Sequence, residues 1–137
     1  MKTSESLKNF APAFRKAQSE MEAVKKDSTN PHFKNKYADI NSIINAVTEI
    51  LNRNNISFSQ HPVSTERGVG VTTILMHDSG EWIQDSYALP LAKPGAQQGS
   101  GAVTYARRYG LQSICGLRAY DDDDGNKAEG PGGDDFL

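Results

Sequence analysis

The sequence predicts an α+β domain in which helices pack on one face of a three-stranded antiparallel meander. Three observations support this class: two amphipathic segments before residue 55, three β-rich segments between residues 56 and 89, and a further helical segment after them. An order of helix, helix, three strands and helix is typical of one sheet with helices gathered against it. The chain has 137 residues, 36% of them hydrophobic, which suits one domain with a modest core.

The first helix is predicted from apolar residues that recur every three or four positions between Leu7 and Val24. Thr3 or Ser4 can cap it. Pro12 either marks its first turn or kinks it, because proline lacks the N–H that an interior position would donate.

The second helix is predicted to start at Asp39, a favourable N-cap, and to end at Asn54-Asn55. Its apolar face is almost uninterrupted, so we assign it a structural role only. That face consists of Ile40, Ile43, Ile44, Val47, Ile50 and Leu51.

The three strands are predicted at residues 56–60, 69–77 and 81–89, where apolar and polar residues alternate or β-branched residues cluster. Residues 62–68 are predicted to be a loop, and Asp78-Ser79-Gly80 a hairpin turn. Pro90 should end the last strand, and residues 91–98 should form a loop. The sheet face away from the helices is expected to carry Thr72 or Thr73, Gln84 and Ser86.

The last helix is predicted to follow a glycine-rich turn, Gly95 to Gly101, with Ser100 as its N-cap and Gly116 at its end. Its Arg107 and Arg108 lie about 100° apart on a helix, so both can leave the packed face together. Guanidinium groups bind phosphates bidentately, and the flanking Tyr105 and Tyr109 can stack on bases. The alternative is a solvated arginine pair with the tyrosines in the core.

A second candidate binding segment is the basic and aromatic stretch from His32 to Tyr37. Lys34 and Lys36 could neutralise phosphate while Phe33 or Tyr37 stacks on a base. Equally, the aromatic side chains could anchor this loop to the core, with the lysines only solvating it.

Three blocks of the sequence resemble the Erf (essential recombination function) family of phage single-strand annealing proteins. They are GSGAVTYARRYGL with the following GL and aspartates, DSTNPHFKNKYADINSII at residues 27–44, and VTTILMHDSGEWI at residues 71–83. The blocks occur in the expected order across residues 5–124. Any one of them alone would be a weak signal, whereas their combination is specific.

The resemblance implies a β-β-β-α core and ATP-independent annealing of single-stranded DNA in phage homologous recombination, performed by a ring or related oligomer. It implies single-stranded DNA, the annealed duplex intermediate and further copies of the chain as partners, with a host or phage single-strand-binding protein as a further candidate. The predicted DNA-binding residues are Lys34, Lys36, Tyr37, Lys93, Gln97, Gln98, Ser100, Tyr105, Arg107, Arg108 and Tyr109.

The chain divides by charge into residues 1–120, the expected annealing domain, and residues 121–137, an acidic tail expected to be disordered. The tail has seven carboxylates against one lysine, a net charge of −6, whereas the whole chain carries −2 and residues 1–120 therefore +4. A basic domain with an acidic tail is common among proteins that bind polyanions. The alternative function is a protein-interaction adaptor in which DNA contact is incidental.

No catalytic motif emerges from the sequence, so we expect no enzyme, cofactor or metal. The glycine-rich turn lacks the Lys-Ser/Thr pair of a phosphate loop, and Tyr120 and Pro131 occupy ligand positions of the nearest calcium-loop alignment. A nuclease that uses the aspartate run would need carboxylates fixed on rigid elements. With one cysteine, no signal-like start and no membrane-spanning run, we expect a cytoplasmic protein.

Overall fold

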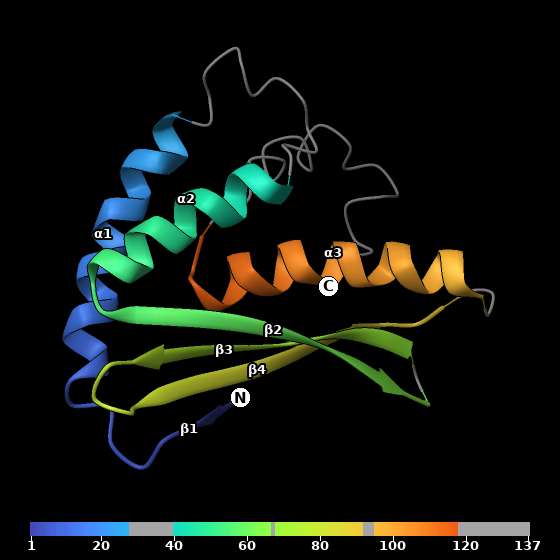
Figure 1. Cartoon of the computed structure of the whole chain (residues 1–137), viewed down its shortest axis with the longest axis horizontal. Helices are drawn as coiled ribbons and strands as arrows, with labels where there is room; N and C mark the ends of the chain where they lie inside the picture. The colour runs from blue at the N-terminus through green and yellow to red at the C-terminus, as the bar shows by residue number, and fades with distance from the viewer. Residues whose placement is uncertain (28–39, 67, 92–94, 118–137) are drawn as a thin grey trace, which may run out of the picture.

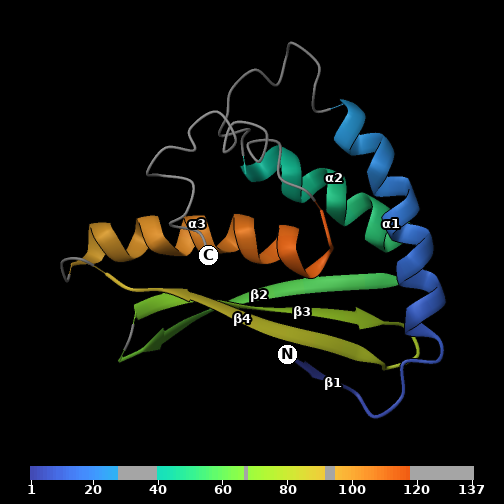
Figure 2. The ribbon, with the colours of Figure 1, turned by 180° about the vertical axis from the view of Figure 1, so that it is seen from behind.

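The computed structural model describes residues 1–27, 40–66, 68–91 and 95–117. Within them, four antiparallel strands form one sheet in the order β1-β4-β3-β2: β1 (Lys2–Thr3), β2 (Ile56–Thr65), β3 (Gly68–His77) and β4 (Trp82–Leu89). Helices α2 (Ile40–Arg53) and α3 (Ala96–Ile114) lie over one face of this sheet, and α1 (Phe10–Asp27) stands across the end where β2 begins (Figure 1, Figure 2). The predicted α+β class is confirmed.

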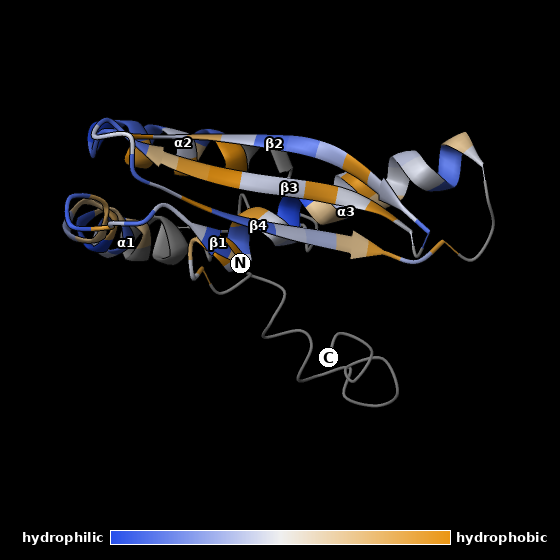
Figure 3. Cartoon of the chain, turned by 90° about the horizontal axis from the view of Figure 1, so that it is seen from below, coloured by the Kyte–Doolittle hydropathy of each residue, from blue (hydrophilic) through white to orange (hydrophobic). Residues whose placement is uncertain are grey.

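The opposite face of the sheet is left uncovered by the described helices (Figure 3). Strand register places Thr72 beside Ser86, and their hydroxyl oxygens lie 2.7 Å apart on this face. Gln84 is on the same face because it alternates with buried Ile83. Thr72, Gln84 and Ser86 therefore lie on the outer face as predicted, together with the apolar Ile74 and Met76, whereas Thr73 is buried on the helix side.

The first residues form a strand instead of capping a helix. Lys2 and Thr3 pair with Gln84 and Ile83, and Ser4 continues the contact by donating its N–H to Trp82 O at 2.9 Å. Helix α1 is capped from a distance: the Glu81 carboxylate accepts the N–H groups of Asn9 and Phe10 at 2.8 and 2.7 Å. A carboxylate from the hairpin between β3 and β4 thus satisfies the donors that Thr3 or Ser4 was expected to satisfy.

Strand β2 is longer than predicted, because it continues through Pro62 to Thr65. The expected loop at residues 62–68 is therefore wrong for most of its length, since Pro62 is in register with Val71 of β3. β2 is an edge strand, and proline is tolerated there because the position that lacks an N–H can face the side without a partner strand.

The α3 helix begins earlier than predicted, at Ala96, with Gly95 instead of Ser100 as its N-cap. The expected glycine-rich turn is thus the first part of the helix itself. The C-terminal prediction is confirmed: Gly116 has φ 71°, and Leu117 N–H bonds to Gln112 O at 2.8 Å in a Schellman motif.

The hydrophobic core lies where the three helices meet the start of β2, the end of β3 and the start of β4. Its fully buried members include Met21 of α1, Leu51 of α2, Leu75 of β3 and Leu111 of α3. Each described element except the short β1 therefore contributes to one core, which fixes α3 against the sheet.

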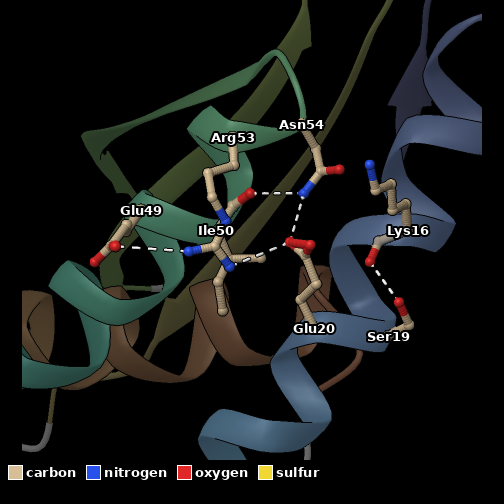
Figure 4. A network of polar contacts seen from close by, with 7 residues as sticks. All are labelled: Lys16, Ser19, Glu20, Glu49, Ile50, Arg53 and Asn54. Atoms are coloured by element: carbon tan, nitrogen blue, oxygen red, sulfur yellow. Dashed lines mark hydrogen bonds and ion pairs between the residues drawn. The ribbon is translucent and has the colours of Figure 1, made fainter.

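A polar clamp joins α1 to the end of α2 (Figure 4). Glu20 accepts from Asn54 Nδ2 at 2.9 Å and from Arg53 at 3.3 Å, and Asn54 Nδ2 also donates to Ile50 O at 2.8 Å. The hydrogen bond from Asn54 lowers the pKa of Glu20. Asn55 has φ 65°, so the Asn54-Asn55 turn ends α2 as predicted. The predicted N-cap of this helix, Asp39, lies outside the described residues.

Candidate nucleic-acid interface

Helix α3 approaches the sheet closely at Gly110. A Cβ added there would lie 3.3 Å from Thr73 Oγ1 and 3.5 Å from a Val71 methyl. Beside this contact, Gln60 Nε2 donates to Thr73 Oγ1 at 3.0 Å and to the Arg107 carbonyl at 2.9 Å. The Gln60 side chain of β2 thus ties the turn of α3 that bears Arg107 to the sheet, and it fixes the position of the Arg107 backbone.

An open groove, here called the α3 groove, lies between the N-terminal half of α3 and the paired ends of β2 and β3. Its volume is about 460 Å³. It has an apolar wall and, along its length, hydroxyl groups and one guanidinium. The lining residues are Pro62, Val63, Ser64 and Val69 from the strands and Ala96, Gly99, Ser100, Val103, Thr104 and Arg107 from the helix.

The start of α3 adds a favourable electrostatic environment for anions. Its N-cap, Gly95, makes no side-chain capping bond, and the first turn holds no acidic residue. Backbone N–H groups at a helix start carry the positive end of the helix dipole. An anion in the groove would therefore meet these dipoles at one end and Arg107 at the other.

The two adjacent arginines have different surroundings, which corrects the expectation that both leave the packed face. Arg107 is partly exposed in the α3 groove, and its guanidinium forms no hydrogen bond or ion pair with another described residue. Arg108 is only 9% exposed. Its guanidinium carbon lies 4.5 Å from the centre of the Tyr109 ring, and its Nη2 donates to Tyr109 Oη at 2.8 Å. Arg107 is thus available to a phosphate, whereas Arg108 supports a tyrosine.

Three tyrosines form an aromatic row on the β4 side of α3. The ring centres of Tyr105 and Tyr109 are 4.4 Å apart, and Tyr87 of β4 lies 6.4 Å from Tyr105. All three tyrosine side chains are half-buried. Tyr87 was not among the predicted site residues, although alternation along β4 with buried Ile83 could have placed it on the helix side.

The remaining predicted residues divide into two groups. Gln97, Gln98 and Ser100 are exposed on the first turns of α3, and Ser100 lines the groove. Lys34, Lys36, Tyr37 and Lys93 lie outside the described residues. The structure therefore places Ser100 and Arg107 in the α3 groove and Tyr105, Arg108 and Tyr109 in the tyrosine row, whereas Gln97 and Gln98 line neither. It adds Gln60, Ser64 and Tyr87, which come from strands.

The described residues include no group of three or more His, Cys, Asp or Glu side chains that could hold a metal ion. Cys115 is buried at 1% exposure, and burial raises the pKa of its thiol to about 12, so it is protonated at neutral pH. No helix in the described part of the chain is long and apolar enough to cross a membrane.

The sequence profile of the ERF superfamily matches residues 10–134, which is most of the chain and includes α1 through α3. The chain belongs to the ERF superfamily. No curated protein and no solved structure gives a significant match. Membership of the ERF superfamily suggests a role in phage recombination and strand annealing. The Arg107 turn, the α3 groove and the tyrosine row all lie within the matched residues.

Proposed function

We propose that this protein binds single-stranded DNA along α3 and anneals complementary strands as an oligomer, without ATP. The observation that carries the proposal is the position of Arg107, partly exposed in an open groove among the hydroxyls of Ser64, Ser100 and Thr104. Membership of the ERF superfamily supports the same conclusion independently.

The α3 groove suits the sugar–phosphate backbone better than a single base sequence. Arg107 presents a planar fork that matches a phosphate bidentately, and the hydroxyls can donate to neighbouring phosphate or sugar oxygens. No described group in the groove is a carboxylate or amide arranged to read base edges. Binding should therefore depend strongly on salt and only weakly on sequence.

The tyrosine row supplies stacking surface on the other side of the same helix. The tilted rings of Tyr87, Tyr105 and Tyr109 follow one another in this row, and Arg108 contacts the last ring. A strand that crosses α3 between groove and row would have its phosphates held and its bases supported.

Annealing needs no nucleotide hydrolysis, because base pairing itself releases about 1.4 kcal/mol per step. The protein has to hold one strand extended and reduce phosphate repulsion towards the incoming strand. One subunit offers a single exposed arginine in its groove, so useful affinity requires several subunits on one strand. This is the physical reason for proposing an oligomer.

The test combines affinity and annealing rate for a single-stranded oligonucleotide and its complement. We expect binding that weakens steeply with salt, annealing faster than the spontaneous rate, and no effect of added ATP. Arg107→Gln should lose most of this activity. Arg107→Lys should keep part of it, because it retains the charge without the fork. Lys2→Gln, at an exposed residue of β1 outside the groove, controls for net charge. Spontaneous-rate annealing by the folded wild-type protein would refute the proposal.

A further inference from the structure

Helix α1 stands at the end of the molecule away from the N-terminal half of α3, which borders the α3 groove (Figure 1). It carries a second basic surface. Lys8, just before the helix, and Arg15 and Lys16 within it are all exposed. Residues 10–19 contain no acidic side chain, and the nearest described carboxylate on α1, Glu20, feels the charge of Lys16 but is bonded to Asn54 and Arg53 of the clamp. None of the three cations forms an ion pair with another described residue. These three residues are called the α1 basic face.

The described part of the chain ends next to this face, at Leu117. Gln18 of α1 donates to the carbonyl oxygen of Cys115 at 2.9 Å, so the end of α3 touches α1 one turn from Arg15. The following Leu117 packs against the core. One helical turn is about 5.4 Å, so the described end of the chain lies about one turn of α1 from Arg15.

The run Asp121–Asp124 begins four residues after Leu117. An extended chain spans at most about 3.5 Å per residue, which puts these aspartates within about 14 to 24 Å of Leu117. Four consecutive carboxylates on so short a connection have an effective concentration in the millimolar range at the α1 basic face. The connection is therefore long enough to reach the α1 basic face, and the charges of the two segments are opposite.

We propose that Asp121–Asp124 of the same chain occupies the α1 basic face. This contact neutralises a surface that would otherwise attract phosphates, and it leaves the α3 groove as the accessible cationic surface. The consequence for DNA rests on the proposed function, whereas the contact itself does not. Exposed ion pairs are individually weak and screened by salt, so the contact is reversible.

The contact can be tested without DNA. A spin label can be attached to Gly125→Cys alone, because Cys115 is too buried to react. If the tail docks, this label should broaden the backbone amide signals of Arg15 and Lys16. The matched control has the same label and the same chain length, with Asp121 to Asp124 replaced by Asn. Broadening should fall in this control and in about 1 M salt, where the Debye length is about 3 Å. Equal broadening with Asp and with Asn would overturn the proposal.

The consequence for DNA is tested by a double-substitution cycle on the full chain. Replacing Asp121 to Asp124 by Asn should raise affinity for single-stranded DNA, on the order of fivefold for a few exposed charge contacts. Adding Lys8→Gln, Arg15→Gln and Lys16→Gln should cancel that gain. An equal gain in both backgrounds would show that the tail acts elsewhere and would overturn the proposal.

Two further outcomes separate the occupants. The three Gln substitutions in the α1 basic face are compared in the chain with the native aspartates and in the chain with Asn at residues 121–124. If they weaken DNA binding equally in both, DNA already occupies this face in the native chain and the proposal is wrong. If no variant binds single-stranded DNA, the proposed function fails, and the spin-label comparison still decides whether the tail docks.

Discussion

The most informative perturbation separates the two adjacent arginines of α3, because the structure gives them different tasks. Arg107 stands partly exposed in the α3 groove, whereas Arg108 is 9% exposed and bonded to Tyr109. Replacing each singly by Gln removes one charge in both cases. Any difference between the two variants must then come from the surroundings of the side chain.

Arg107→Gln should weaken DNA binding and leave stability nearly unchanged. A charged hydrogen bond to a phosphate contributes about 1.5–3 kcal/mol, and partial exposure reduces this to about 1–2 kcal/mol, a factor of about 5 to 30 per subunit. One lost phosphate contact should also reduce the slope of log affinity against log salt by about 0.7 per subunit. Fluorescence anisotropy of a labelled oligonucleotide across a salt series measures both effects.

Arg108→Gln should act mainly on the folded state. It removes the 2.8 Å bond to Tyr109 Oη and the cation over the ring, which should cost about 1–3 kcal/mol of unfolding free energy. Urea denaturation of both variants gives the comparison. The reasoning is refuted if Arg107→Gln binds DNA like the wild type while Arg108→Gln loses binding at unchanged stability.

Three other predictions test the fold and the site. The hydrogen bond from Asn54 lowers the pKa of Glu20 below the ordinary 4.5. Burial raises the pKa of Glu81, but the hydrogen bonds from Phe10 and Asn9 together outweigh it, so this pKa is also below 4.5. The stability contributed by these two carboxylates is therefore present above pH 4.5 and is lost as the pH falls through their lowered pKa values. Glu20→Gln and Glu81→Gln should each make the free energy of unfolding fall less steeply with decreasing pH. An unchanged acid limb of the stability–pH curve would contradict this prediction. Gly110→Val should cost about 1–3 kcal/mol in urea unfolding, because α3 would be pushed off Thr73 and Val71, and a neutral result would mean that the helix is not held there. Tyr87→Ala should weaken DNA binding while Tyr87→Phe preserves it, since stacking needs the ring and not the hydroxyl; equal binding by both would remove the tyrosine row from the interface.

Much of the fold could be predicted from local patterns. Spacings of three and four residues located α1 and α2, and alternation located β3 and β4 with Thr72, Gln84 and Ser86 on the outer face. These patterns report how each segment divides its residues between core and solvent, and that division depends on neighbours within the segment. Gly116 ended α3 as predicted because a left-handed φ is a local property of glycine.

The errors occurred where distant residues decide the outcome. Glu81 caps α1 from another part of the chain, so no nearby Ser or Thr marks the start of that helix. Pro62 belongs to a strand because β2 is at the sheet edge, and edge position is a property of the whole sheet. The early start of α3 across Gly99 and Gly101 likewise departs from glycine's low helix propensity, which is a weak preference that tertiary packing overrides.

By itself, the sequence determined the class of fold, the family and the helix that carries the Arg-Arg pair. Only the tertiary structure decided that Arg107 faces a groove while Arg108 is buried on Tyr109, and that Tyr87 joins the aromatic row. Neighbouring helical residues point about 100° apart, so which of them meets solvent depends on how the helix is rotated on its sheet. That rotation is set by the close contact of Gly110 with Thr73 and by the Gln60 bond to the Arg107 carbonyl, which are contacts between residues far apart in the chain.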